Sequence, residues 1–286
     1  ALQREDVNMH IDRNAMRAAL ERMIGHVEAL PEFECATVRG RQVTAGDAAA
    51  LDAAVAQSWH DALSDLDVKL DLRVSPADAP AYATAAGAVR LGFERAQLLG
   101  LQVGGTADAP LYRVVRRDGM RFDIGVRLNV DATCPALGLE AAREPERRLE
   151  GRYWPCLALT HADAFWFVQV QALGKLLRGD YLIAAHLANC QVNETLVMQM
   201  RQRDDATGTN VHRYGGRDRL AYLDIALPGF IVSYDATESA VARQLCAAAE
   251  AYDALMPQLS QGYAPRTGIF YELWRCYQAE LGICQA

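Results

Sequence analysis

Lysine is nearly absent from this chain of 286 residues: of 29 lysines and arginines, only Lys69 and Lys175 are lysines. Aspartate and glutamate number 36, so the formal net charge is −7. A protein that neutralises nucleic-acid phosphates usually carries an excess of basic residues, so this balance argues against a nucleic-acid partner. The acidic balance favours a cationic small-molecule partner. Because lysine is so scarce, the places of Lys69 and Lys175 in the fold are of interest.

Long apolar runs and regular cysteine spacings are also missing. No run approaches the ~20 residues that a membrane helix requires, and the polar residues 1–6 do not resemble a secretory signal. We therefore expect no membrane partner and a cytoplasmic location. The seven cysteines lack any C-x-x-C spacing, which favours buried thiols in a reducing compartment over a disulfide framework or a zinc site.

The pattern along the chain predicts an α+β fold in two parts. The first half predicts helices over 9–27, 46–62 and 79–91, strands over 35–38, 65–74, 111–115 and 121–126, a turn at Gly104–Gly105 and a hairpin at Asp118–Gly119. The second half is mainly helical, with long helices over 165–177, 181–200 and 239–255. A charged segment that contains Pro145 predicts a linker, and hence domains 1–145 and 146–286.

Residues 65–74 alternate strictly between charged and apolar side chains. Because successive side chains of a strand point to opposite faces, this alternation predicts one apolar and one charged face. Asp65 and Asp67 then share a face and are close enough to bind one divalent cation, for which Mg²⁺ is the natural choice beside phosphates. Solvated strands carry such pairs too, so the pair alone does not establish a catalytic site.

A third carboxylate, Asp123, lies in the middle of a predicted strand, between Phe122 and Ile124. An unpaired carboxylate on a half-buried strand costs free energy. Two interpretations are open: Asp123 completes the site of Asp65 and Asp67, or it pairs with one of the many arginines.

Three segments together resemble, in order, the motifs of the nucleotidyltransferase superfamily, and within it of the aminoglycoside 6-adenylyltransferases that act on streptomycin. The first is residues 64–68, which are similar to the Asp-x-Asp strand of the family. The second is the hairpin 111–124, which ends at the third carboxylate. The third is Phe165-Trp166-Phe167 together with residues 175–180, which resemble a pattern of the helical domain. The likeness runs from about residue 35 to 219.

The resemblance implies a mixed sheet with flanking helices, a C-terminal helical bundle and an active site in the cleft between them. It implies a metal-dependent enzyme that transfers AMP from Mg-ATP to a hydroxyl of an aminoglycoside-like cationic molecule, a modification of an antibiotic. In that assignment Asp65, Asp67 and Asp123 bind Mg²⁺, and Asp123 is also the general base. Lys175 contacts the triphosphate.

The family usually has Gly-Ser after its first strand, where this chain has Gly40 and Arg41. Backbone N–H groups near Gly40 and the charge of Arg41 replace the phosphate contacts in one interpretation; in the other, the donor site is impaired. Lys69 follows Asp67 on the same face and is a weaker candidate for a phosphate ligand, the alternative being an ion pair with Asp67 or Asp71.

Several alternatives stay open at this point. The protein is an adenylyltransferase for an aminoglycoside or for another acceptor such as a lincosamide, or a nucleotidyltransferase-fold protein that binds or regulates without transfer. It is a monomer or a homodimer. The aromatic residues 165–167 fill the helical core or stack on the nucleotide base. Asp180 and Glu194 line an acidic pocket or are ordinary helix-surface acids, and residues 212–217 form a phosphate-binding or an exposed loop.

Overall fold

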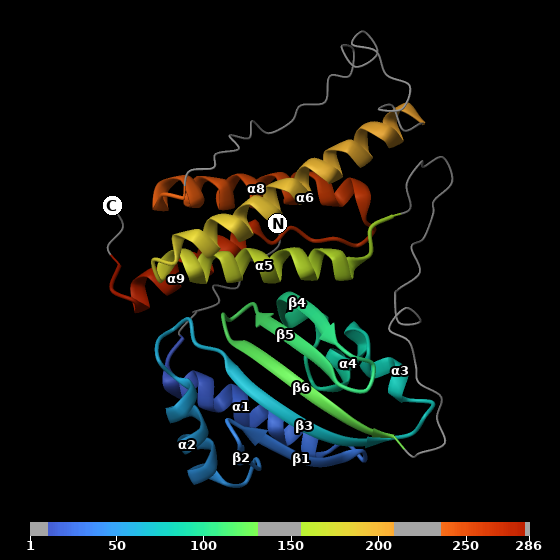
Figure 1. Ribbon diagram of the computed structural model, residues 1–286, viewed down its shortest axis with the longest axis vertical. Coiled ribbons are helices and arrows are strands. Elements are labelled where there is room, and N and C mark those ends of the chain that lie inside the picture. The colour runs from blue at the N-terminus through green and yellow to red at the C-terminus, as the bar shows by residue number, and fades with distance from the viewer. Residues whose placement is uncertain (1–10, 131–155, 209–235, 284–286) are drawn as a thin grey trace, which may run out of the picture. The chain divides into compact units, whose positions relative to one another are not determined.

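The computed structural model describes residues 11–130, 156–208 and 236–283 (Figure 1). The chain forms two compact units, Ala1–Arg143 with Ile269–Ala286, and Glu144–Gly268. The first break lies close to the boundary predicted at residue 145. The second break differs from the prediction, because the C-terminal residues from Ile269 belong to the first unit and not to the helical one.

The first unit is built on a six-stranded mixed sheet (Figure 1). Its strands, in the order in which they lie side by side, are β2 (Arg41–Gln42), β1 (Phe33–Val38), β3 (Leu66–Val74), β6 (Arg121–Val130), β5 (Pro110–Arg116) and β4 (Leu98–Gly105). The central pair, β3 and β6, is parallel, and the neighbouring pairs are antiparallel. The two strands that carry the predicted carboxylates are therefore direct neighbours.

The alternation in β3 divides the sheet into an apolar and a charged face. On the apolar face Leu66, Val68, Leu70, Leu72 and Val74 are all buried. Helices α1 (Arg13–Glu28) and α2 (Ala48–Ser58) contribute further buried apolar side chains and contact strands β1 and β3, respectively. Burial of this face supplies the hydrophobic stabilisation of the sheet and leaves the charged residues on the other face.

Two elements of the first unit differ from the sequence prediction. The single helix expected over 79–91 is two short helices, α3 (Ala79–Tyr82) and α4 (Ala85–Arg90), because the hydroxyl of Thr84 accepts a hydrogen bond from the backbone N–H of Ala86 and starts a new helix. The turn expected at Gly104–Gly105 is the end of strand β4, which the apolar residues Leu98–Leu101 begin.

Helix α9 (Thr267–Glu280) attaches the C-terminal residues to the first unit. The hydroxyl of Tyr277 donates to the carbonyl of Gly119, at 3.1 Å. Gly119 closes the predicted hairpin between β5 and β6 with a φ of 86°, and a Cβ there would collide with Ile11 and Leu273. The glycine thus allows both the turn and the close approach of α9.

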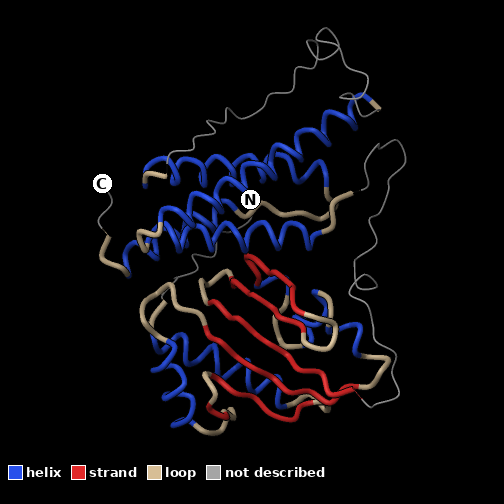
Figure 2. Tube along the Cα trace, in the orientation of Figure 1, coloured by secondary structure: helices blue, strands red, loops and turns tan. Residues whose placement is uncertain are grey.

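The second unit is helical, as Figure 2 shows, with α5 (Leu159–Leu177), α6 (Tyr181–Thr207) and α8 (Glu238–Leu259) among the described residues. Phe165, Trp166 and Phe167 are buried in α5, so they pack the core of this unit. Together with the mixed sheet, these helices confirm the predicted α+β fold class. Within the described ranges, no helix combines the length and the apolar character needed to cross a membrane.

Candidate active site

The structure brings the three predicted carboxylates together on the charged face of the sheet. Asp67 of β3 and Asp123 of β6 are direct partners in the parallel pairing, so their side chains lie on the same face of neighbouring strands. Asp65 immediately precedes β3 and lies two residues before Asp67, which places it on that face as well.

Each of the three carboxylates faces an arginine. Asp67 Oδ2 lies 2.6 Å from Arg39 Nη2, and Asp123 Oδ2 lies 3.7 Å from Arg113 Nε. Asp65 Oδ2 lies 4.0 Å from Arg121 Nη2. Asp123 therefore neighbours the other two carboxylates and also pairs with an arginine, as the second sequence interpretation expected.

The electrostatic environment of Asp123 reflects this mixture of charges. Burial raises the pKa of its carboxyl most, and the negative charge of Asp65 raises it further. The positive charges of Arg113 and Arg121 lower that pKa, and Asp67 adds a smaller increase. A carboxylate that is half-buried beside two others is a place where a bound cation gains strong attraction.

The donor chemistry of this site fits Mg²⁺, because carboxylate oxygens are the ligands that hard divalent cations prefer. In the part of the chain that the structure describes, however, no group of three or more His, Cys, Asp or Glu side chains is arranged to hold a metal ion. Binding of Mg²⁺ by Asp65, Asp67 and Asp123 therefore requires these side chains to turn away from their arginines.

Further along β3, on the same face, Asp71 has its own partners. Arg127 contacts both carboxylate oxygens of Asp71, at 2.8 and 2.6 Å, and this arginine lowers the pKa of the Asp71 carboxyl. Cys35 Sγ donates to Asp71 at 3.2 Å, and burial raises the pKa of the Cys35 thiol. Asp67 and Asp71 thus have arginine partners, so neither of the ion pairs weighed for Lys69 forms here.

An open patch adjoins the carboxylates on the charged face. Gly125 of β6 lies two residues beyond Asp123, between Lys69 of β3 and Leu111 of β5. A Cβ at Gly125 would have nothing within 4 Å. A glycine in the interior of a strand weakens it and often marks close approach of a ligand, so this patch has room for a bound molecule.

The turn between β1 and β2 presents Arg39, and not Arg41, to the carboxylates. Arg39 and Gly40 form the turn with φ angles of 51° and 80°, and Arg39 extends to Asp67. Arg41 pairs with Val38, whose side chain lies on the apolar face, so Arg41 points to the opposite side of the sheet edge. The predicted phosphate contact of Arg41 is therefore not on the carboxylate face.

Sequence reasoning did not single out Arg39 or Arg113. A usable signal exists for Arg113, because the hairpin centred on Asp118 pairs positions 113 and 123. For Arg39 the signal is weaker. Arg39 directly precedes Gly40 in a two-residue turn, and the conformation of this turn determines on which face of the sheet the Arg39 side chain lies.

The remaining predicted residues lie in the second unit, where they have local partners. Lys175 Nζ lies 3.7 Å from Asp180, whose side chain also accepts the N–H of Ile183 at the start of α6. Glu194 lies 2.9 Å from His161 Nε2, and this contact lowers the pKa of the Glu194 carboxyl. Residues 212–217 lie outside the described residues.

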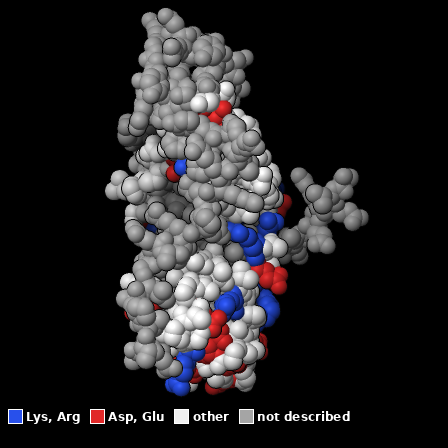
Figure 3. Space-filling view, turned by 90° about the vertical axis from the view of Figure 1, so that its right-hand side faces the viewer, with Lys and Arg blue, Asp and Glu red and all other residues white. Residues whose placement is uncertain are grey.

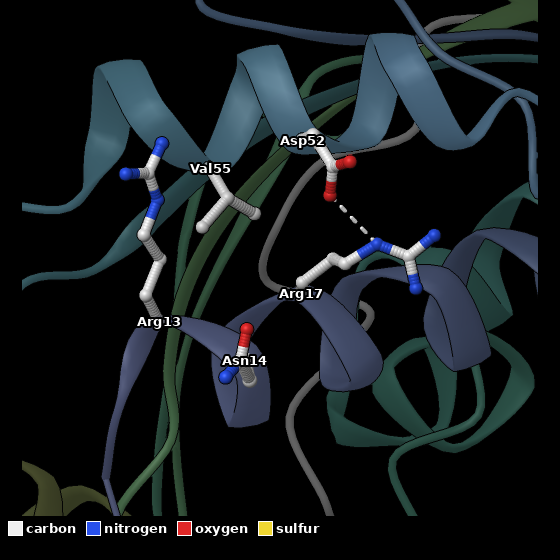
Figure 4. Close-up of a pocket in the computed structure, with 5 residues that line it drawn as sticks. All are labelled: Arg13, Asn14, Arg17, Asp52 and Val55. Carbon is white, nitrogen blue, oxygen red and sulfur yellow. Dashed lines mark hydrogen bonds and ion pairs between the residues drawn. The ribbon is translucent and has the colours of Figure 1, made fainter.

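The first unit has two further surface features. Figure 3 shows acidic and basic side chains intermixed, rather than segregated by sign, on the side of the first unit that it presents. A pocket of about 260 Å³ lies between α1 and α2, where Arg17 reaches Asp52 at 2.8 Å (Figure 4). None of the three carboxylates is among the residues that line this pocket, so the pocket is separate from them.

Comparison with known proteins finds similarity among solved structures alone. No family model matches this chain, and no curated protein matches it. Among solved structures the chain is similar to an aminoglycoside 6-adenyltransferase from Bacillus subtilis, with 10% sequence identity over 93% of this chain and 98% of that chain. The TM-score of 0.26 is too low for this likeness to support an assignment of function.

Proposed function

We propose that the charged face of the sheet is the active site of a metal-dependent nucleotidyltransferase. The observation that carries the proposal is the register of β3 and β6, which sets Asp67 directly opposite Asp123 with Asp65 on the same face. These residues come from segments more than fifty positions apart in the chain, and they are the residues that the motif resemblance singles out. We infer AMP as the transferred group and a hydroxyl of an aminoglycoside-like cationic molecule as the acceptor.

The proposed roles follow from the chemistry of each group. Asp65 and Asp67 hold Mg²⁺, which neutralises charge on the phosphates of ATP. Asp123 accepts the proton of the acceptor hydroxyl, a role that suits a carboxyl whose pKa is raised by burial. The hydroxyl oxygen then forms a bond to the α-phosphorus while the bond from that phosphorus to pyrophosphate breaks, and pyrophosphate leaves with the electron pair.

Contacts to the nucleotide are proposed at two positions on or near this face and one elsewhere. Lys69 is exposed on the charged face next to Asp67, and the backbone at Gly40 lies in the adjoining turn. Lys175 is proposed as a triphosphate ligand on the motif resemblance alone. The open patch at Gly125 leaves room beside Asp123 for the acceptor or the nucleotide.

A second candidate is a protein that has kept this fold and binds a ligand without transferring a group. It is favoured by the arginine partners of all three carboxylates and by the Arg39-Gly40-Arg41 turn in place of Gly-Ser. The two candidates differ in whether pyrophosphate is released.

The proposal is tested by incubating the protein with ATP labelled at the α-phosphate, Mg²⁺, and a panel of aminoglycosides and lincosamides. We expect metal-dependent labelling of at least one acceptor together with pyrophosphate release, and loss of both in Asp123→Asn. Asp71→Asn is the matched control, because Asp71 lies on the same face but is held by Arg127. Absence of transfer with all four nucleoside triphosphates, from a folded protein, would favour the second candidate.

A further inference from the structure

Two arginines bracket the central carboxylates in a single row across the sheet. Arg113 of β5 is the direct partner of Asp123, and Asp123 is the direct partner of Asp67. Beyond Asp67, on the side of β1, Arg39 occupies the position that follows the Val38–Val68 pair. The row therefore reads arginine, aspartate, aspartate, arginine, with no net charge.

Both ion pairs of this row can break with little loss of folding free energy. The side chains of Arg39 and Asp67 are 43% and 44% exposed, and those of Arg113 and Asp123 are 40% and 29% exposed. Ion pairs this accessible to water contribute little to stability, so their partners exchange readily. Arg113 Nε is moreover buried without a hydrogen-bond partner, since its distance of 3.7 Å to Asp123 is too long for one.

A divalent cation held by Asp65 and Asp67 beside Asp123 would change the charge balance of this row. The two arginines would then face a dication instead of two bare carboxylates, so their attraction to the row is lost. A triphosphate that accompanies the cation supplies new negative charge beside them. A guanidinium binds phosphate oxygens through two parallel hydrogen bonds, which makes arginine well suited to this second role.

We propose that Arg39 and Arg113 are exchangeable counterions: they neutralise Asp67 and Asp123 when no metal is bound, and they transfer to the triphosphate oxygens when Mg-ATP binds. This inference rests on the proposed function and deepens it, because it assigns the phosphate contacts that this chain makes in place of a Gly-Ser motif. Arg39 lies in the turn directly before Gly40, where those contacts are expected.

The proposal predicts effects of opposite sign on two ligands, which a purely structural ion pair would not produce. Arg39→Gln removes a cation that competes with metal, so the affinity for Mg²⁺ alone should rise roughly two- to fivefold. The same change removes a charged hydrogen-bond donor to phosphate, so the affinity for α,β-methylene-ATP in the presence of Mg²⁺ should fall roughly tenfold or more. Arg113→Gln should behave in the same way.

Isothermal titration calorimetry measures both affinities without turnover, since α,β-methylene-ATP cannot release its pyrophosphate analogue. The control is Arg73→Gln, because Arg73 lies on the same face of β3 but pairs with Glu34. A second variant, Arg39→Lys, keeps the competing charge but not the planar fork, so it should leave Mg²⁺ affinity unchanged and still weaken nucleotide binding. Circular dichroism spectra and melting temperatures check that each variant is folded.

The outcomes separate this inference from the function on which it rests. Tighter Mg²⁺ binding with unchanged nucleotide binding in Arg39→Gln and Arg113→Gln would show that the arginines are counterions only, and would overturn the proposal. Unchanged binding of both ligands would also overturn it. If the wild-type protein bound α,β-methylene-ATP equally well with and without Mg²⁺, the proposed metal-dependent function itself would be contradicted.

Discussion

Asp67 and Asp123 lie directly opposite each other in the parallel pair of β3 and β6, each held by an arginine from the strand or turn on its outer side. Two like charges on adjacent strands destabilise a sheet unless cations compensate them. The two flanking arginines, Arg39 and Arg113, compensate the paired carboxylates in this way.

A side chain introduced at Gly125 should leave the protein folded but weaken the binding of a ligand over this patch. Because a Cβ at Gly125 meets nothing within 4 Å, and because β-branched residues favour strands, Gly125→Val should keep or slightly raise the melting temperature. If nucleotide or acceptor binds over this patch, Gly125→Val should weaken its binding more than Gly125→Ala does. Equal affinities in a series from glycine to alanine to valine would show that no ligand lies there.

The helical unit should depend strongly on a buried ion pair. Arg266 Nη2 contacts Asp163 Oδ1 at 2.8 Å, and both side chains are more than nine-tenths buried. Removal of one partner leaves a buried charge, so Asp163→Ala should lower the free energy of unfolding by about 3–5 kcal/mol. Chemical denaturation measures this loss, and the double variant Asp163→Leu with Arg266→Met should recover most of it.

The stability of the helical unit should also depend on the charge of Glu194. His161 lowers the pKa of the Glu194 carboxyl below its ordinary value of 4.5. A carboxyl whose pKa is lowered by folding adds stability above its unfolded pKa, and this stability is lost as the pH falls through its folded pKa. The destabilisation of Glu194→Gln relative to wild type should be full near neutral pH and shrink in acid. A pH-independent difference in denaturation midpoints would argue against this contact.

Helix α9 should stabilise the first unit and not the helical one. Leu273 of α9 is fully buried and adjoins Gly119 of the β5–β6 hairpin. A buried leucine reduced to alanine typically costs about 2–5 kcal/mol. Hydrogen exchange in Leu273→Ala should therefore speed up in β5 and β6, while α5 and α8 keep their protection. The reverse pattern would place the C-terminal residues with the second unit, as the sequence suggested.

Periodicity predicted the parts of the fold in which one rule dominates. The strict alternation of β3 and the Asp118–Gly119 turn are local patterns, and both are confirmed. Strand β4 was missed because its run of apolar residues ends in Gly104–Gly105, which local rules assign to a turn. The membership of α9 in the first unit was missed because it depends on contacts between residues more than 150 positions apart.

The carboxylates of the candidate site could be predicted from the sequence, but the arginines that pair with them could not. The Asp-x-Asp pattern and Asp123 follow from alternation and from the motif resemblance. The sequence analysis named Arg41 and not Arg39, because a change of one residue in the register of the β1–β2 turn moves a side chain to the other face of the sheet. The arginine that faces Asp67 is known only once this turn is placed.

The central claim is that Asp67, with its neighbours on this face, binds nucleotide through a divalent cation. The most direct test is calorimetric titration of wild type, Asp67→Asn and Asp71→Asn with α,β-methylene-ATP, each with Mg²⁺ and with EDTA. We predict nucleotide binding that depends on Mg²⁺ in wild type and in Asp71→Asn, and loss of that dependence in Asp67→Asn. Binding that is the same in all three proteins, or that is indifferent to Mg²⁺ in wild type, would contradict the account.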